Sequence, residues 1–486
     1  MADVQLSLIS HTNVGKTTLA RTLLRKDVGE VVDAPHVTEL ASDYTLIETS
    51  AGDALRVWDT PGFGDSARLL KRLQQGGKAL GWFLTQVWDR YTDRPFFSSQ
   101  QALCNVRDEA DVVLYMVNSA EDPTGVGYLD AEMRIVGWLG KPVIVLLNQM
   151  GPPRAADRER EEVERWRRFL ARYDWVRDTL AFDAFARCWV QEHALLDCIG
   201  AALPAEQHDA YARIDAAWRA RNEDIFRRSV SALAEQLATV AADSEQVPTS
   251  GLGETAKAWL RSVVTGGERR NDALDRAMKA MAERADARIR KVTDELIALH
   301  GLSGGAAAEV QARMAGDFAV DTAASRGKAG MIGAAVSGAI GGLAADLATG
   351  GLTLGGGALV GALVGAAGAA GIAHGYNLLR GTEASTVRWD GEVLNRLVRA
   401  AVLRYLAVAH FGRGRGDYVE SEYPPHWPPT VEEAVKGEAA VLGQTWAIAE
   451  GGAAASSLQA TLEGSLHRVL RAVLDRLYPA KQQEAA

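Results

Sequence analysis

The chain of 486 residues has little cysteine, no excess of basic charge and no recognisable export signal. Its three cysteines show no metal-ligand spacing, which argues against a disulfide framework and against a zinc site. Lys and Arg total 53 against 62 Asp and Glu, and the net charge of −9 argues against a general nucleic-acid-binding protein. The low cysteine content leads us to expect a protein of the reducing cytoplasm, and the first residues, which lack a basic start, a long apolar core and a cleavage site, predict no secretory signal.

Length and composition indicate a folded protein of several domains. At roughly 150 residues per domain the chain is long enough for two to four. Apolar residues make up 47% and charged residues 24%, which is typical of a globular protein. We predict two parts, 1–203 and 204–486.

The first part alternates short apolar runs with helical patterns, which is typical of βαβ units around a mostly parallel sheet. It is therefore predicted to be an α/β domain. A charged helix is expected over Asp157–Arg172, where the Arg and Glu side chains form a solvated face. The predicted strands are Val4–Ile9, Asp43–Glu48, Ala54–Trp58, Val112–Val117, Val143–Leu147 and Asp178–Phe182.

The second part is rich in Ala, Glu and Arg with helical periodicity, which predicts an all-α domain. A segment rich in Pro and Trp, 423–429, is expected to be a loop. The predicted helices are Ala205–Ala242, Glu254–His300, Glu392–His410 and Leu458–Leu477.

Residues 327–380 are predicted to form a glycine-rich helical hairpin. No charge occurs from Ala329 to Ala345, and after Asp346 the next Asp, Glu, Lys or Arg is Arg380. Small residues at four-residue spacing let helices approach closely, as membrane helix pairs do. We therefore expect contact with a membrane through 327–380, at the cytoplasmic face of the inner membrane. The alternative is a tightly packed Gly/Ala helix pair within a soluble helical domain.

A phosphate-binding loop follows the first predicted strand. Backbone N–H groups that open a helix cradle phosphate oxygens, a lysine reaches the β- and γ-phosphates, and the next hydroxyl binds Mg²⁺. Lys16 and Thr17 fit these two roles, and Ser10 stands where the motif usually has its first glycine. The residues predicted to contact nucleotide here are Ser10, Asn13, Val14, Gly15, Lys16, Thr17 and Thr18.

A second motif supports this site. Asp59-Thr60-Pro61-Gly62 directly follows the strand Ala54–Trp58, and an aspartate at a strand end is able to hold Mg²⁺. Alone, the four residues would be better interpreted as a turn. Together with the phosphate loop they predict a nucleotide site with bound metal.

These residues carry a family resemblance. Asn13-Val14-Gly15-Lys16-Thr17, followed one hairpin later by Asp-Thr-Pro-Gly, resembles the Era/TrmE branch of P-loop GTPases over about residues 3–150. The chain is also similar to uncharacterised bacterial GTPases that carry a carboxy-terminal helical domain of unknown function. The resemblance implies GTP and GDP as ligands, Mg²⁺ as the metal, and GTP hydrolysis as the activity.

The resemblance also implies roles for single residues. Thr38 matches the switch threonine that senses Mg²⁺ and the γ-phosphate, and Gly62 would offer its N–H to that phosphate. Lys16, Thr38 and Gly62 are thus the predicted catalytic residues, and Thr17, Thr38 and Asp59 the predicted Mg²⁺ ligands. Asn13 matches the asparagine that helps to hold K⁺ in potassium-activated relatives; the alternative is a loop residue that bonds its own backbone.

The sequence departs from the family pattern at two places. Ras-like enzymes orient the attacking water with a glutamine where this chain has Phe63, which predicts slow hydrolysis. The base-binding motif Asn-Lys-x-Asp is here Asn148-Gln149-Met150-Gly151. Asn148 and Gln149 remain predicted base-site residues. The missing aspartate lowers the expected selectivity for guanine, so ATP use stays open, and the loop around Asp183 is a candidate for a replacement contact.

Between Gly62 and the next strand the segment 63–110 is longer than in the family, giving an enlarged switch II region. Its aromatic residues are interpreted as core or as a surface for a protein partner or self-association. We therefore predict a GTP-binding switch with slow hydrolysis. The alternative is a non-hydrolysing membrane or scaffold protein with a degenerate site. An RNA-associated factor is disfavoured, because the charge is acidic and no RNA-binding motif is visible.

Overall fold

The computed structural model divides into two compact units, which are described separately. Unit 1 comprises Met1–Asp224, Ala409–Asp417 and Leu477–Ala486, and unit 2 comprises Ile225–Val408 and Tyr418–Arg476. The structure describes residues 2–25, 41–74, 94–151, 154, 156–184, 188–248, 272–302, 376–380, 384–411 and 424–479.

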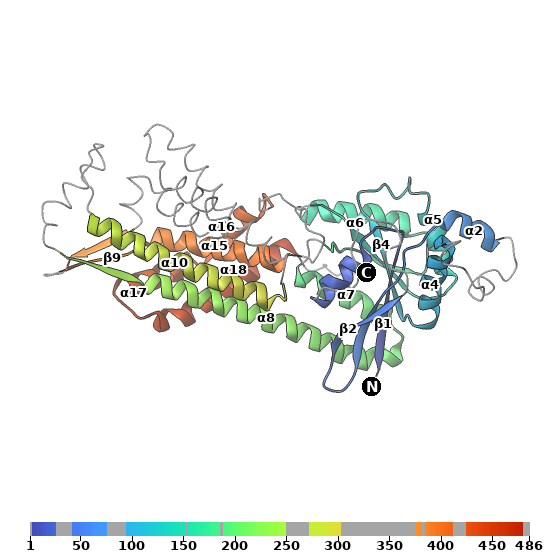
Figure 1. Ribbon diagram of the computed structural model, residues 1–486, viewed down its shortest axis with the longest axis horizontal. Coiled ribbons are helices and arrows are strands. Elements are labelled where there is room, and N and C mark those ends of the chain that lie inside the picture. Colours follow the sequence, from blue (N-terminus) through green and yellow to red (C-terminus); the bar gives the residue numbers. More distant parts are fainter. Residues whose placement is uncertain are drawn as a thin grey trace. The chain divides into compact units, whose positions relative to one another are not determined.

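Unit 1 is an α/β domain around a six-stranded sheet in the order β2-β3-β1-β4-β5-β6 (Figure 1). Only β2 runs antiparallel, paired with β3, and the other neighbours are parallel. The fold class predicted for this part is confirmed, and each of the six predicted strands is present. The strands are β1 (Asp3–Ser10), β2 (Ser42–Glu48), β3 (Ala54–Asp59), β4 (Val112–Asn118), β5 (Val143–Asn148) and β6 (Val176–Ala181).

Helices cover both faces of this sheet, because its central strands are apolar on both sides. Leu114 and Met116 of β4 belong to one core, whereas Tyr115 and Val117 belong to the other. Helices α1, α7 and the start of α8 pack on the first face, and α2, α4, α5 and α6 pack on the second. Their bounds are α1 (Lys16–Leu24), α2 (Ser66–Gln74), α4 (Arg94–Asp108), α5 (Leu129–Gly137), α6 (Ala156–Leu170), α7 (Trp189–Ala202) and α8 (His208–Ala242).

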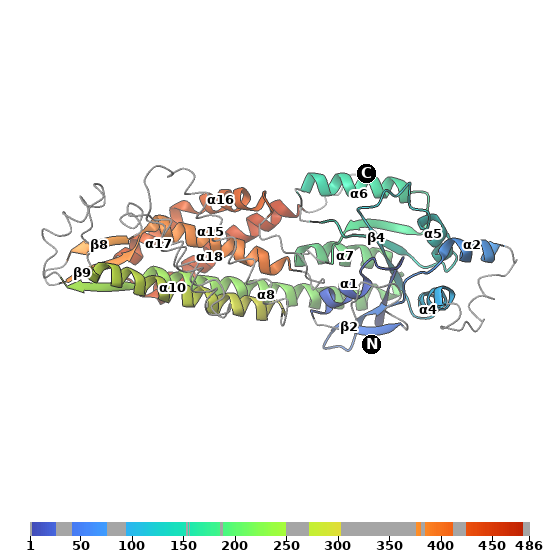
Figure 2. The same cartoon turned by 45° about the horizontal axis from the view of Figure 1, so that its top comes forward.

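Unit 2 is largely helical, as predicted (Figure 2). Trp427 begins helix α16, so the expected loop 423–429 ends earlier than predicted. Pro is well tolerated in a first helical turn, where the backbone N–H has no partner to lose. The helices are α10 (Asp272–Leu299), α15 (Gly391–Ala409), α16 (Trp427–Gly437), α17 (Ala439–Glu450) and α18 (Ala455–Leu477), together with the second half of α8.

A small antiparallel sheet in unit 2 was not predicted from the sequence. Its order is β7-β9-β8, formed by β7 (Ser244–Pro248), β9 (Ala384–Trp389) and β8 (Tyr376–Arg380). Residues 376–380 are therefore strand rather than the end of a helical hairpin. The rest of the predicted hairpin, 327–375, lies outside the described residues, as does Thr38. Among the helices within the described ranges, none has the length and apolar character that a membrane crossing requires.

Candidate functional site

The loop between β1 and α1 has the backbone of an anion-binding turn. Asn13 and Gly15 both have positive φ, 63° and 100°, and Lys16 begins the helix. Successive N–H groups in such a turn converge on one concavity beside the positive helix end. A Cβ on Gly15 would lie 2.8 Å from Nδ2 of Asn148, so glycine is required there for space as well as for conformation.

Ser10 has a function that the sequence alone did not reveal. Its buried hydroxyl accepts a hydrogen bond from Nζ of Lys16 at 2.9 Å and donates to the carbonyl oxygen of His11. The serine that replaces the usual glycine therefore holds the lysine side chain inside the loop. The replacement of glycine by Ser10 is therefore compatible with Lys16 at the phosphate site.

Lys16 is a buried cation. Its side chain is only 7% exposed, and burial lowers its pKa to about 8, against the opposing influence of Asp59 and Glu132. A buried ammonium without a full countercharge is unfavourable, and an anion placed beside it relieves that cost. The loop is therefore prepared for a strongly negative ligand.

This pKa gives a testable pH dependence. Bound phosphates would stabilise the ammonium and raise its pKa, whereas in the free protein it is about 8. Binding above that pH requires proton uptake, so the affinity for GDP should fall as pH rises, by up to about tenfold per pH unit. Fluorescence titrations from about pH 6.5 to about pH 9.5 would measure this, with Lys16→Met as the control without the titration. A flat profile for the wild type would contradict it.

Thr17 and Asp59 are brought together as the sequence predicted. Oγ1 of Thr17 donates to Oδ2 of Asp59 at 2.6 Å, although the residues are 42 positions apart. Asp59 is 2% exposed, and burial raises its pKa despite the hydrogen bond from Thr17 and the charge of Lys16. Oδ1 of Asp59 is buried and has no hydrogen-bond partner among the residues that the structure describes. A hydroxyl beside an unsatisfied carboxylate oxygen fits a hard divalent cation such as Mg²⁺.

The Asp-Thr-Pro-Gly turn lies against the phosphate loop. The N–H of Phe63 donates to the carbonyl oxygen of Ser10 at 2.9 Å, which ties the turn to the end of β1. A Cβ on Gly62 would lie 3.0 Å from Cα of Thr12 and 3.1 Å from Nζ of Lys16. Gly62 therefore lies beside Lys16 at the phosphate loop. The ring of Phe63 is fully buried in the core, so it takes no part in orienting water.

Asn148, a predicted base-site residue, joins the loop after β6 to the phosphate loop. Its Nδ2 donates to the carbonyl oxygen of Val14 at 2.5 Å, and its Oδ1 accepts the N–H of Ala184 at 2.7 Å. Gln149 also contacts the phosphate loop, since its Nε2 donates to the carbonyl oxygen of Asn13 at 3.2 Å. The buried carboxylate of Asp183 accepts the N–H of Met150 at 2.7 Å, next to Gly151.

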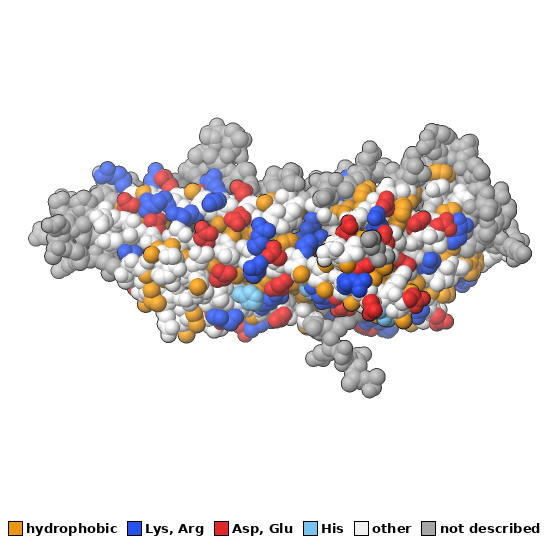
Figure 3. Space-filling view, turned by 90° about the horizontal axis from the view of Figure 1, so that it is seen from below, with side chains coloured by type: hydrophobic (Ala, Val, Ile, Leu, Met, Phe, Trp, Pro, Cys, Tyr) orange, Lys and Arg blue, Asp and Glu red, His pale blue; other side chains and the backbone are white. Residues whose placement is uncertain are grey.

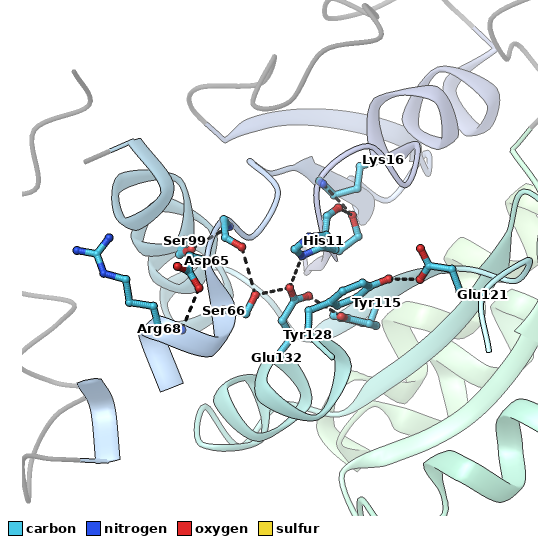
Figure 4. Close-up of polar contacts among 12 residues, drawn as sticks. His11, Lys16, Asp65, Ser66, Arg68, Ser99, Tyr115, Glu121, Tyr128 and Glu132 are labelled. Atoms are coloured by element: carbon cyan, nitrogen blue, oxygen red, sulfur yellow. Dashed lines mark hydrogen bonds and ion pairs between the residues drawn. The ribbon is translucent and has the colours of Figure 1, made fainter. Parts of the chain in front are cut away.

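One further polar cluster beside the phosphate loop was missed in the sequence. Glu132 of α5 is fully buried and accepts hydrogen bonds from His11, Ser66 and Tyr115 (Figure 4). No motif marks these residues, because they are scattered over four elements. A glutamate among apolar residues of a short helix was the only available signal.

Two family models match parts of the chain. A model of a family described as 50S ribosome-binding GTPase matches residues 5–149, and a model of a domain of unknown function (DUF3482) matches residues 167–475. Residues 5–149 are therefore a P-loop GTPase domain, and the resemblance to GTPases followed by an uncharacterised helical domain is confirmed. No curated protein matches the chain.

The solved structures that match the chain include two of Era. One, in complex with MgGDPNP and part of 16S ribosomal RNA, has 18% identity and a TM-score of 0.31. The other, a variant of Aquifex aeolicus Era with GDP and aluminium fluoride, has 17% identity and a TM-score of 0.32. In both, the match covers 42% of this chain and 58% of the Era chain. A bacterial selenocysteine-specific elongation factor has 14% identity and a TM-score of 0.25, covering 38% of this chain and 26% of the factor.

Proposed function

The chain belongs to the family defined by the domain of unknown function at residues 167–475, and because a GTPase domain precedes it, we propose a GTP-dependent regulatory switch with slow hydrolysis. The observation that carries this proposal is the convergence of Lys16, Thr17, Asp59 and Gly62 at one loop. These groups come from two motifs far apart in the sequence. This convergence favours a working nucleotide site over a non-hydrolysing scaffold with a degenerate one.

The chemistry follows from the groups present. Loop N–H groups and Lys16 would bind the β- and γ-phosphates, and Thr17, Thr38 and Asp59 would hold Mg²⁺, which neutralises phosphate charge. Water attacks the γ-phosphorus, the bond to the β,γ-bridging oxygen breaks, and GDP leaves with that electron pair. Because such transition states need little covalent help, positioning and charge compensation supply most of the catalysis. With Phe63 in the core, hydrolysis is proposed to be slow unless a partner supplies the missing group.

Selectivity for guanine is proposed to depend on Asp183. Gly151 provides no carboxylate in the loop after β5, whereas Asp183 brings one to the same loop from the end of β6. Asp183→Asn keeps the size and an acceptor for Met150, so only the charged acceptor is lost. We expect the preference for GTP over ATP to fall roughly 10- to 100-fold, the worth of a bidentate base contact.

Competition binding of GTP and ATP would measure that preference. The matched control is Asp157→Asn, which changes an exposed aspartate on α6 that pairs with Arg160. An unchanged ratio in Asp183→Asn would contradict the role of Asp183. A wild type without preference would instead mean that Gly151 has relaxed the base specificity.

The switch function is tested by phosphate release from purified protein with Mg²⁺, with GTP and ATP compared, each in KCl and NaCl. GTP turnover establishes the enzyme, and stimulation by K⁺ would give Asn13 its proposed role. Asn13 is exposed on the phosphate loop, where it would be available to a cation. GTP binding without turnover would favour a non-hydrolysing or activator-dependent protein.

A site of action at the cytoplasmic membrane face is proposed from the composition of 327–380, and flotation with anionic vesicles would test it. Phe63 and Phe96 of segment 63–110 lie in the core, and a protein partner or self-association through the rest of this segment stays a proposal. The GTPase family model is described as ribosome-binding, but the acidic balance gives no support for RNA here. On the face drawn in Figure 3, acidic and basic side chains are interspersed. Sedimentation with ribosomes would distinguish a ribosomal partner from another protein.

A further inference from the structure

A buried carboxylate joins the phosphate loop to the start of α2 (Figure 4). Oε1 of Glu132 accepts hydrogen bonds both from Nδ1 of His11, at 2.7 Å, and from the hydroxyl of Ser66. Oε2 accepts from the hydroxyl of Tyr115 at 2.5 Å. We call Glu132 with these three partners the Glu132 hub.

The hub is not explained by packing. A charge with no exposed surface is retained at a cost, and an apolar residue of similar size would fill the space more favourably. Each partner lies in a different element: His11 in the phosphate loop, Ser66 at the first residue of α2, and Tyr115 in β4. The carboxylate therefore specifies the relative position of these elements.

His11, the first partner of Oε1, is held in place by its neighbours. The ring of His11 stacks on Tyr128 with ring centroids 4.0 Å apart, and the hydroxyl of Tyr128 donates to Glu121 at 2.7 Å. The ring therefore has little freedom, and a movement of the loop is passed to Glu132. The phosphate loop is thus connected to Glu132 through His11.

The second partner of Oε1, Ser66, is connected to the turn that contains Gly62. Ser66 lies four residues after Gly62, which is close to Nζ of Lys16. The N–H of Gly64 donates to Ser99 of α4 at 3.2 Å, and Asp65 accepts the N–H of Arg68 at 3.0 Å, capping α2. The short segment between Gly62 and Ser66 is thus well defined, so a shift of Gly62 toward a γ-phosphate would also move Ser66.

We propose that Glu132 is a positioning residue that couples the phosphate loop to α2, by sharing one carboxylate oxygen between His11 and Ser66. This rests on the proposed GTP-dependent switch and names its internal connection. The charge of Glu132 also acts on Lys16, whose pKa it raises against the effect of burial. A ligand that moves the turn at Gly62 therefore alters the surroundings of Lys16 in the phosphate loop. By linkage, a ligand that binds the phosphate loop also shifts the position of the turn.

The test compares the affinities of a non-hydrolysable GTP analogue and of GDP. His11→Ala and Ser66→Ala should each change their ratio roughly tenfold, as expected for loss of one hydrogen bond to a charged group. The double variant should add little, since both changes break the same connection. His11→Asn should restore the ratio, because its amide nitrogen replaces Nδ1 as the donor.

Tyr115→Phe is the matched control. It removes a donor from the same carboxylate but on the scaffold strand, so the ratio should stay within about twofold of the wild type. An unchanged ratio in Ser66→Ala, additive effects in the double variant, or an equal effect of Tyr115→Phe would each overturn the proposal.

A readout without nucleotide separates this inference from the proposed function. Hydrogen exchange of the amides of α2 in nucleotide-free protein should accelerate about tenfold in His11→Ala and return to normal in His11→Asn. If the wild type binds neither nucleotide, the proposed function fails while this measurement still tests the hub. Unchanged exchange in His11→Ala would refute the connection even in a protein that hydrolyses GTP.

Discussion

Lys16→Ala is expected to lower GTP turnover by at least about 100-fold without unfolding the protein, since removing one preorganised charge at a transition state commonly costs this much. The effect should be large because Lys16 is buried in the loop beside Gly62, where the transferring phosphate would lie. Because Phe63 lies in the core and does not orient water, charge compensation is expected to be the main catalytic contribution.

The fold should survive this change because the lysine is not placed there for stability. Burial lowers its pKa from 10.5 to about 8, and at about 1.4 kcal/mol per unit the buried ammonium costs on the order of 3 kcal/mol. Alanine loses the packing of the lysine stem, but it also removes the cost of the buried ammonium, which offsets part of the lost stability. Denaturant unfolding without nucleotide should therefore show little loss of stability.

Phosphate release and denaturant unfolding without nucleotide would measure the two effects side by side. Lys279→Ala is the control, since it removes an exposed lysine of α10 that pairs with Glu283. Turnover that persists in Lys16→Ala would mean that the observed hydrolysis does not arise at this loop. Parallel loss of stability and turnover would show that the lysine has a structural role.

The six-stranded sheet could be predicted from the sequence because its strands are short apolar runs bounded by turns. Val112–Val117 is apolar at every position, as a strand buried on both faces must be. The sheet of unit 2 was missed because its pairing is non-local. Strand β7, Ser-Glu-Gln-Val-Pro, is polar and five residues long, and it pairs with β9 more than a hundred residues away. Nothing local marks such a strand.

The site was predictable to the extent that it follows a motif. Lys16, Thr17 and Asp59 occupy the places that their spacing implies, because a loop after one strand and a turn after its parallel neighbour meet at one sheet edge. The hydroxyl of Ser10 and the Glu132 hub were not predictable. Glu132 is 121 residues from His11, and only the folded chain brings them within 2.7 Å.

Asp59→Asn should abolish the response to Mg²⁺ while leaving the metal-free protein folded. Burial raises the pKa of Asp59, so above that pKa its charge costs stability unless a cation compensates it, and a neutral amide removes this cost. The amide oxygen still accepts the hydrogen bond of Thr17, but the orphaned position of Oδ1 no longer offers an anionic ligand.

We therefore expect turnover with GTP to fall about 100-fold or more, because metal neutralisation of phosphate charge is worth several kcal/mol. Thermal unfolding with GDP, with and without Mg²⁺, provides the second measurement, since a ligand stabilises only a protein that binds it. The wild type should be stabilised further by Mg²⁺ and the variant should not, while both unfold alike in EDTA. A variant that still responds to Mg²⁺ would place the metal elsewhere in the site. A variant that unfolds early in EDTA would show that the charge of Asp59 is needed for stability, because its attraction to Lys16 then outweighs the cost of burying it.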